Sequence, residues 1–205
     1  MTKKEKVRAE LVLAARKAFT SHGYAQTTMD DIARAAGKAK STLYYYFESK
    51  EDAFRAVIDL EGETLKKLLL KIIRDPNRTA LQKVRDYVLT RWQEFEKLGN
   101  FYRTMRREFI ENYDFVQKYR RKFDEIEIQF ISMILKQGVE SKEFIIITDD
   151  IDMVASAIFL SMKALEIPFF AKKNSGNIKS KLNTLLNMLF YGITGTENNH
   201  ENSLI

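Results

Sequence analysis

Apolar residues recur at helical spacing along nearly the whole chain. The first stripe holds residues at positions i, i+4, i+7, i+8, i+11 and i+12: Val7, Leu11, Ala14, Ala15, Ala18 and Phe19. Gly23 follows and is expected to end this helix in a left-handed cap, because glycine has no Cβ to oppose that conformation. Thr28 and Asp31 then have the spacing of a capping box. They predict a short helix over 29–36.

Residues that end or cap helices also divide the next part of the chain. Gly37 is expected to end the second helix, and a third helix is predicted over 40–47. Three short helices in so little sequence predict one compact unit, residues 1–50. Ser49 and the two acidic residues that follow Lys50 then start a long amphipathic helix, since acids are favoured in a first turn. This helix is expected to reach Arg74, shortly before a proline.

The rest of the chain has the same helical periodicity. It predicts helices over 79–98, 101–112, 114–138 and 178–192, and a further helix that Asp149 or Asp150 caps and that reaches about residue 170. Gly99 and Asn100 are expected to separate the first two. The only strand-like run, 144–147, has no partner strand in the sequence and is interpreted as a buried extended connector. The pattern therefore predicts an all-α fold, with a larger helical domain over 51–193 and a flexible polar tail over 194–205.

The composition is that of a globular protein whose N-terminal part is basic. Hydrophobic residues make up 45% of the chain and charged residues 30%, which allows a sizeable core. Of the net charge of +6, residues 1–50 carry ten Lys and Arg against five Asp and Glu, whereas the rest of the chain carries 24 against 23. Positive charge confined to one segment is expected where a protein meets a polyanion, although such a segment can also be a solvated surface.

Several classes of protein are excluded by residue content. The chain has no cysteine and therefore no disulfides or thiol catalysis. The longest apolar stretch, 153–162, has half of the about twenty residues that a membrane helix needs, and the basic start lacks the apolar run of a signal peptide. His22 and His200 are the only histidines, and no glycine-rich phosphate loop appears. We expect a cytoplasmic protein that is not an enzyme and holds no metal or cofactor.

The stretch 27–52 carries the functional signal. It predicts two short helices joined by a turn at Gly37, an arrangement that projects the second helix into a DNA major groove. The apolar residues expected to hold this unit together are Phe19, Ile32, Ala33, Leu43 and Phe47. Because Leu43 and Phe47 share one face of the third helix, its other side and N-terminal end remain for base edges and phosphates. The residues there are Lys40, Ser41, Thr42, Tyr44 and Tyr45.

This stretch resembles the DNA-binding domain of the TetR family of bacterial repressors. The resemblance rests on Thr27-Thr-Met-Asp-Asp-Ile-Ala, Gly37, Thr42-Leu-Tyr-Tyr-Tyr-Phe and Ser49-Lys-Glu-Asp. It implies a three-helix helix-turn-helix domain followed by a helical ligand-binding and dimerisation domain. The base contacts that it implies are Lys40, Ser41, Thr42 and Tyr44. The phosphate contacts that it implies are Thr28, Tyr45, Tyr46 and Lys50.

Three residues depart from the family's pattern. Lys38 stands where a small apolar residue is usual, Ser41 replaces glycine or proline, and Tyr46 stands where histidine is frequent. The alternative role for the tyrosines is core packing. Adjacent residues cannot both face one core from a helix, so this alternative is strongest for Tyr46. The first lysines are expected to form a solvated tail, the alternative being contact with an adjacent groove: Lys3, Lys4 and Lys6.

The last two long helices predict a homodimer. Each is apolar on more than one side, so each needs packing partners on two sides. A second copy of the chain supplies one partner in a two-fold, four-helix interface, and the alternative is a helix pair buried within one subunit. The interface candidates are Ile158, Leu165, Leu182, Leu185, Leu186 and Leu189. A dimer implies a palindromic operator with half-sites about 34 Å or more apart.

The middle of the chain is rich in aromatic residues and methionine. Bundle cores hold ligand sites, and aromatic walls suit large apolar or flat molecules, although aromatics at helical spacing are also ordinary core. The effector-pocket candidates are Trp92, Phe95, Tyr102, Met105, Phe109, Phe130, Met133, Phe159 and Met162. An anionic head group has candidate partners that otherwise form a solvated face: Arg103, Arg106, Arg107, Arg120 and Arg121.

These features predict a sequence-specific DNA-binding transcriptional regulator. Its expected partners are double-stranded DNA, a second copy of the chain and a small apolar or aromatic effector that releases it, as a repressor, from its operator. The effector is expected to tilt the helix that ends at Arg74 and so to change the separation of the two recognition helices. The alternative is a helical ligand-binding protein that does not bind DNA, against which the basic segment argues.

Overall fold

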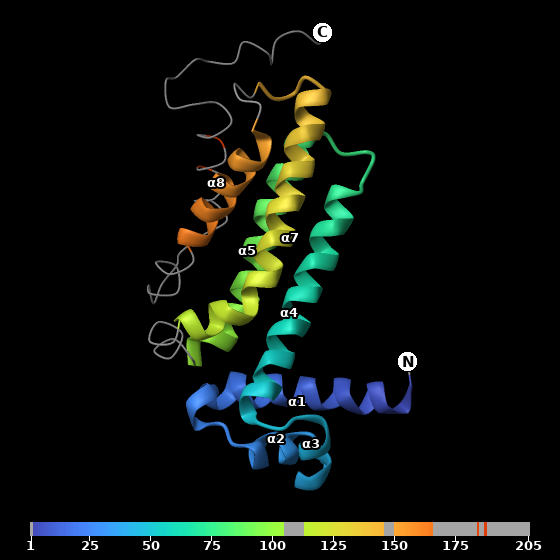
Figure 1. The fold of residues 1–205 in the computed structure, drawn as a ribbon, viewed down its shortest axis with the longest axis vertical. Helices are drawn as coiled ribbons and strands as arrows, with labels where there is room; N and C mark the ends of the chain where they lie inside the picture. Colours follow the sequence, from blue (N-terminus) through green and yellow to red (C-terminus); the bar gives the residue numbers. More distant parts are fainter. Residues whose placement is uncertain (1, 105–112, 146–149, 166–183, 185–186, 188–205) are drawn as a thin grey trace. The chain divides into compact units, whose positions relative to one another are not determined.

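The described part of the chain is built from seven helices (Figure 1). The structure, a computed structural model, describes residues 2–104, 113–145 and 150–165, with Thr184 and Asn187 besides. Its helices are α1 (Lys3–Gln26), α2 (Met29–Ala35), α3 (Lys40–Tyr46), α4 (Lys50–Ile73), α5 (Ala80–Thr104), α7 (Tyr113–Glu140) and α8 (Ile151–Ala164). No strand occurs among these residues, and the predicted all-α fold is confirmed. All seven helices belong to a compact unit, Met1–Lys173, which is distinct from Asn174–Ile205.

Carboxylates and hydroxyls fix where several helices begin. Ser49 caps α4 and Asp150 caps α8, each by accepting a hydrogen bond from the backbone N–H three residues later, at 3.1 and 2.8 Å. These two starts are as predicted. The start of α5 is capped from far along the chain, because the Glu143 carboxylate accepts from the N–H groups of Ala80 and Leu81, both at 3.0 Å.

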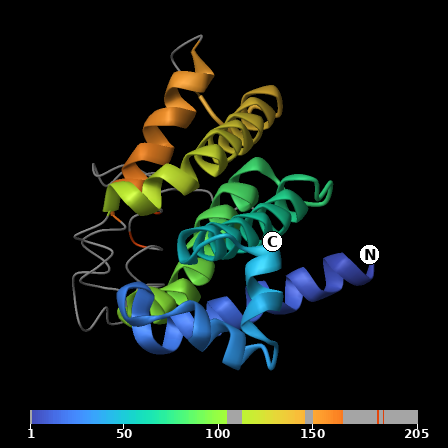
Figure 2. The same cartoon turned by 60° about the horizontal axis from the view of Figure 1, so that its bottom comes forward.

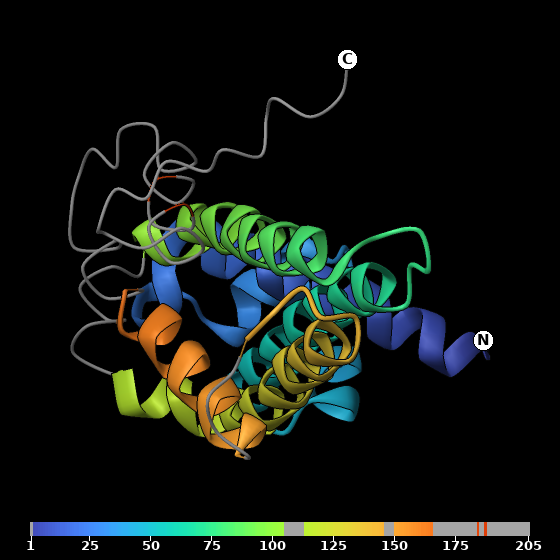
Figure 3. The ribbon, with the colours of Figure 1, turned by 90° about the horizontal axis from the view of Figure 1, so that it is seen from above.

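The helices pack as a bundle with α1 and the two short helices α2 and α3 at one end. α4, α5 and α7 lie side by side, and α8 packs on α7 (Figures 1 and 3). α1 crosses the first turns of α4 and also packs on α5 (Figure 1), while α2 packs on α1 and α3 on α2 (Figure 2). None of the helices in the described segments combines the length and apolarity that crossing a bilayer requires.

One hydrophobic core joins α1, α2 and α3 to the start of α4. It contains all five residues predicted to hold the first unit together, each at most 4% exposed: Phe19, Ile32, Ala33, Leu43 and Phe47. Phe54 and Val57 of α4 lie in the same core and are fully buried. The predicted core is confirmed, and a movement of the first turns of α4 must therefore move α1–α3 with it.

One of two glycines interrupts a helix as expected and the other does not. Gly23 has φ 79° and ψ 166°, a non-helical conformation that breaks α1 where the sequence predicted, and a second helical piece then reaches Gln26. The Thr27 hydroxyl that follows donates to the carbonyl oxygens of Gly23 and Ala18, at 2.5 and 3.3 Å. α5 runs through Gly99 to Thr104. One glycine costs a helix about 1 kcal/mol, which is too little to end a helix that packs on α1 and α7.

The expected buried connector after α7 is also wrong where it is described. Phe144 covers Gly138, since a Cβ on that glycine would lie 2.0 Å from the Phe144 ring. The backbone N–H of Phe144 donates to the carbonyl of Gly138 at 3.0 Å. This turn leaves Ile145 exposed at 92%. The remaining residues of the connector, the second half of the helix predicted over 101–112, and the helix and tail predicted over 178–205 lie outside the described residues, apart from the two single residues.

Gly62 sets the distance between α4 and α7. A Cβ at Gly62 would lie 2.3 to 2.6 Å from three carbons of the Phe123 ring, closer than van der Waals contact permits. The ring itself is buried at 9% exposure, and Leu65, Ile126 and Phe130 line the small hollow beside it. The two helices therefore approach closely only because this position has no side chain.

We expect Gly62→Ala to destabilise the protein although alanine favours a helix. The gain in helix propensity is about 1 kcal/mol, whereas forcing a group into a packed core costs typically about 1–3 kcal/mol. Urea unfolding followed by circular dichroism measures the net loss. Phe123→Leu in the Gly62→Ala background should restore part of it by removing ring atoms. A single variant more stable than the parent would show that α4 and α7 separate freely here.

Candidate nucleic-acid interface

The turn between α2 and α3 depends on glycine. The backbone N–H of Gly37 donates to the carbonyl of Arg34 at 3.1 Å, and that of Lys38 donates to the carbonyl of Ala33 at 3.0 Å. These are the two hydrogen bonds of a Schellman motif. Gly37 has a φ of 60°, a conformation that costs a residue with a side chain about 1–2 kcal/mol. The predicted turn at Gly37 is confirmed.

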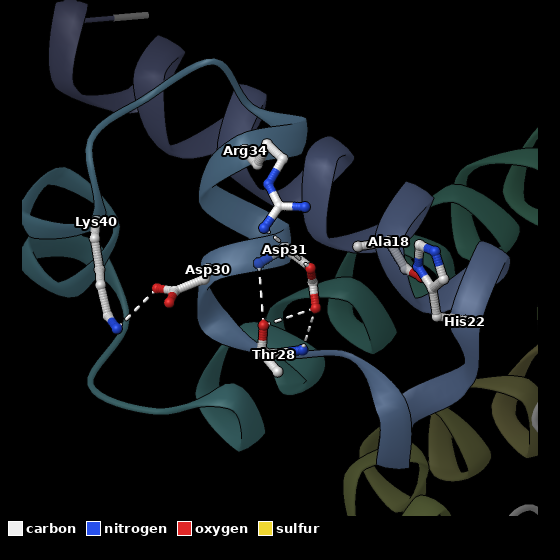
Figure 4. Close-up of polar contacts among 7 residues, drawn as sticks. All are labelled: Ala18, His22, Thr28, Asp30, Asp31, Arg34 and Lys40. Carbon is white, nitrogen blue, oxygen red and sulfur yellow. Dashed lines mark hydrogen bonds and ion pairs between the residues drawn. The ribbon is translucent and has the colours of Figure 1, made fainter.

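The predicted capping box fixes the start of α2 (Figure 4). The N–H of Asp31 donates to Thr28 Oγ1 at 3.2 Å, and the N–H of Thr28 donates to the Asp31 carboxylate at 3.0 Å. The Thr28 hydroxyl also donates to this carboxylate at 2.7 Å, and this bond lowers the pKa of Asp31. A phosphate contact by Thr28, which stays a prediction, would therefore take the hydroxyl hydrogen away from Asp31.

The predicted face of α3 is directed to solvent. Lys40 and Ser41 are exposed, and Tyr44 and Tyr45 are exposed at 45% and 69%. Thr42 is half-buried. Tyr46 packs against the hydrophobic core and holds its ring 5.0 Å from that of Tyr45. The exposure thus matches a contact surface for Lys40, Ser41, Tyr44 and Tyr45. Tyr46 is half-buried against the core, and its phosphate contact stays a prediction.

Lys50, which is remote in sequence, caps the C-terminal end of α1. Its ammonium donates to the carbonyl oxygens of Tyr24 and Ala25, at 2.8 and 3.2 Å, and lies 4.5 Å from the centre of the Tyr24 ring. A cation is favoured at the carbonyl end of a helix. An ammonium has three donors, so one donor remains for the phosphate contact that was predicted. His22 Nδ1 lies 3.3 Å from the carbonyl oxygen of Ala18, also near this end (Figure 4).

Acidic residues accompany the cations around the turn. Lys40 Nζ lies 2.8 Å from Asp30 Oδ1 (Figure 4), and Lys38 Nζ lies 3.6 Å from a Glu10 oxygen. The hydrogen bond that Lys40 donates to Asp30 raises the pKa of Lys40, which keeps its ammonium charged. Asp30 and Glu10 were missed from the sequence, because each lies on a different element of the fold from the lysine that it contacts and no local spacing signals such a pair.

The first lysines do not form a tail. α1 begins at Lys3, with a capping box between Thr2 and Glu5. Lys4 Nζ lies 5.2 Å from the centre of the Tyr45 ring, at a distance typical of cation–π contacts. The start of α1 is thus next to the exposed face of α3, so the positive charge of both helices is presented on one side.

A family model decides what this arrangement belongs to. Residues 11–57 match the model described as "Bacterial regulatory proteins, tetR family". The match covers α2, α3, the glycine turn and the start of α4 that shares their core. Residues 11–57 thus form a DNA-binding domain of the TetR family. The chain is a DNA-binding transcriptional regulator.

Relatives extend the likeness beyond that domain. The uncharacterized HTH-type transcriptional regulator YfiR of Bacillus subtilis is 28% identical over 163 residues, which is 69% of each chain. TtgR of Pseudomonas putida is 38% identical over 60 residues, 29% of each chain. The fold as a whole is similar to that of FadR from Bacillus subtilis, solved in complex with stearoyl-CoA, with a TM-score of 0.69 and 21% identity over 90% of this chain and 98% of that one.

The described effector candidates divide into buried and exposed residues. Trp92, Phe130, Phe159 and Met162 are buried at 8% exposure or less, whereas Met133 is exposed at 51%. Phe130 lines the small hollow beside Gly62. The side chains of the other candidates lie outside the described residues: Phe95, Tyr102, Met105 and Phe109. As residues of an effector pocket, all nine candidates stay predictions.

A buried polar cluster lies among these aromatic residues and was not found from the sequence. Glu127 accepts hydrogen bonds from Arg91 Nε at 2.7 Å and from the Tyr87 hydroxyl at 2.8 Å. All three are at most 5% exposed, and the Arg91 guanidinium lies 5.6 Å from the centre of the Phe159 ring. Burial, and then the Glu127 charge, raises the pKa of Tyr87 well above its usual value, so the phenol keeps its proton and donates.

The dimer candidates of α8 lie at its surface. Ile158 is half-buried and Leu165, which ends the helix, is exposed at 43%. Met153 and Leu160, seven residues apart and so on one face, are more exposed, at 58% and 61%. Neither residue is among the interface candidates predicted from the sequence. The remaining candidates lie outside the described residues: Leu182, Leu185, Leu186 and Leu189.

Proposed function

We propose that this regulator is a homodimeric repressor that reads a palindromic operator in the bacterial cytoplasm. The observation that carries the proposal is the exposed face of α3, held by a glycine-dependent turn next to the basic start of α1. We assign base contacts to Lys40, Ser41, Thr42 and Tyr44. We assign phosphate contacts to Thr28, Tyr45, Tyr46 and Lys50. In this proposal residues 1–50 bind DNA and the helices after them bind the effector and the second subunit.

Exposed apolar side chains on α8 support the dimer. Met153 and Leu160 form an apolar stripe with Ala157 and Ala164, at positions i, i+4, i+7 and i+11. Large apolar groups gain free energy when a second surface removes them from water. We infer that this stripe, with Leu165, packs against a second copy and so sets the distance between two copies of α3.

A small, largely apolar effector is proposed for the helices that follow α4. The fold that this chain shares with FadR accommodates a ligand in that protein, whose structure was solved with stearoyl-CoA. Contacts from α7 reach α4 at three levels: Tyr119 donates to Glu51, Lys122 lies 2.7 Å from Asp59, and Phe123 packs on Gly62. A ligand that moves α7 would therefore move α4, and with it α1–α3 through their common core.

Selection of DNA from a random library by the full-length protein tests the proposal. The enriched sequences should share an inverted repeat, and gel mobility shifts should give two chains per duplex. The log–log salt slope should be near −0.9 for each phosphate that a lysine or arginine neutralises, so the two copies of Lys50 among the assigned phosphate contacts should contribute about −2. Equal affinity for selected and scrambled duplexes would support the alternative, a helical ligand-binding protein without specific DNA binding.

The effector half of the proposal has its own test. Stearoyl-CoA, free coenzyme A and octadecanol are added separately to the preformed complex with the selected duplex. Release by an apolar chain, with or without the anionic head, supports the assignment and shows whether the head group matters. If coenzyme A alone releases the DNA, the effector site recognises the polar part and the apolar assignment is wrong.

A further inference from the structure

Asp30 occupies an unusual place on the DNA-facing side of the protein (Figure 4). It belongs to α2, and its carboxylate lies 2.8 Å from the ammonium of Lys40, the first residue of α3. Both side chains are more than half exposed, at 54% and 57%. The capping of α2 is carried by Thr28 and Asp31, so the fold does not require a carboxylate at position 30.

An exposed ion pair of this kind contributes little to stability. Its effect on DNA binding is different, because the binding of any duplex depends on cations that neutralise phosphates and release counterions. An ammonium that already has a carboxylate partner neutralises a phosphate less effectively and so contributes less to the free energy of binding. The carboxylate itself is also carried toward the phosphates and is repelled by them. The pair thus weakens binding to every duplex, whatever its sequence.

A hydrogen bond to a base edge can restore the binding free energy that is lost at the phosphates. The ammonium has three donors, and one of them is directed at Asp30. The other two can reach the O6 and N7 acceptors of guanine in the major groove, the pair of acceptors that lysine and arginine recognise most often. With Asp30 as a fixed neighbour, the Lys40 ammonium has fewer orientations and so loses less entropy when it makes these contacts.

We propose that Asp30 is a specificity-determining residue of this regulator: by holding the Lys40 ammonium it lowers the affinity for DNA in general and directs Lys40 to guanine. The inference rests on the proposed function, since it takes Lys40 as a base-reading residue. It adds a residue of α2 to a recognition surface otherwise made by α3, and it identifies the base that this surface reads.

A double-mutant cycle tests this inference. The dissociation constants of the parent, Asp30→Asn, Lys40→Met and the double variant are measured on the selected operator and on a scrambled duplex of equal length. We expect Asp30→Asn to bind the scrambled duplex about fivefold to twentyfold more tightly, since the dimer carries the pair twice and each exposed pair contributes about twofold to fivefold. The ratio of operator to scrambled affinity should fall by at least about fivefold.

The Lys40→Met background shows whether Asp30 acts by holding Lys40 or by its own negative charge. If Asp30 acts by holding Lys40, Asp30→Asn should tighten scrambled binding much less in that background than in the parent. An equal effect in both backgrounds would overturn the proposal, because Asp30 would then act by its own charge. The guanines of each half-site are then replaced one at a time. One replacement should lower the operator affinity of the parent more than that of Asp30→Asn, and the absence of any such guanine would also overturn the proposal.

A matched control accounts for net charge. Glu63 on α4 is exposed and pairs with Lys66 at 3.3 Å, so Glu63→Gln removes the same charge from an equivalent ion pair away from α3. It should leave the affinity ratio unchanged, and a change equal to that of Asp30→Asn would contradict the proposal. Should the parent select no operator at all, the proposed function fails; an operator with an unaltered ratio in Asp30→Asn refutes the role of Asp30 alone.

Discussion

Replacing Lys40 with alanine should lower operator affinity by about tenfold to a hundredfold for each half-site, the discrimination that a good contact with a guanine edge provides. Binding to a scrambled duplex should change by only about threefold, since Asp30 already neutralises this ammonium in the free protein. Lys40 is exposed at the start of α3 and makes no contribution to the core. The variant should therefore lose specificity while it stays folded and dimeric.

Fluorescence anisotropy with labelled operator and scrambled duplexes measures both affinities, and gel filtration checks the dimer. Lys66→Ala is the matched control, because Lys66 is a lysine of α4 with an acidic partner, Glu63, and lies outside the recognition surface. It should shift both affinities equally and slightly. Retention of full operator affinity by Lys40→Ala would remove Lys40 from the base-reading residues and leave Ser41, Thr42 and Tyr44 to account for specificity.

The parts of this structure that could be predicted from the sequence are those with local causes. Leu43 and Phe47 are four residues apart on one helix face, and both are fully buried. Thr28 and Asp31 have the spacing of a capping box and form one. Gly37 adopts the positive φ for which only glycine is well suited. In each case the interacting residues lie within a few positions of one another, so the sequence pattern is sufficient to predict the feature.

Features that depend on tertiary contacts could not be predicted in this way. Lys50 was assigned to phosphate from its position beside α3, but its ammonium binds the carbonyl oxygens of Tyr24 and Ala25 at the end of α1, which precede it by 26 and 25 residues in sequence. The end of α5 was placed at Gly99, where packing on other helices overrides a weak local preference. The pair of Asp30 and Lys40 joins two helices whose relative placement the sequence does not specify.

The buried cluster of Tyr87, Arg91 and Glu127 is the strongest case of this kind. Glu127 follows Arg91 by 36 residues and Tyr87 by 40, and helical periodicity alone would place charged residues outside the core. A buried ion pair is not in itself a source of stability, because desolvation of both charges offsets their attraction. It does join α5 to α7, and the guanidinium reaches the Phe159 ring of α8, so it fixes how three helices of the second half meet.

We therefore expect Glu127→Ala to be severely destabilising. Removal of one partner leaves the Arg91 guanidinium without this carboxylate in a site that is 1% exposed, and breaking a buried pair costs about 3–5 kcal/mol. The loss is a large fraction of the about 5–15 kcal/mol that keeps a domain folded. Urea unfolding should show it as a lower midpoint, and heating as a lower melting temperature.

Two further variants decide whether the buried charge is the cause. Glu63→Ala, which removes an exposed carboxylate from its pair with Lys66, should change the free energy of unfolding by less than about 1 kcal/mol. The triple variant Tyr87→Phe, Arg91→Met and Glu127→Leu replaces the whole cluster by apolar groups and should recover most of the lost stability, because neither a desolvated charge nor the buried Tyr87 hydroxyl then remains. If the triple variant is as unstable as Glu127→Ala, the loss comes from packing, and the pair has no special part in holding α5, α7 and α8 together.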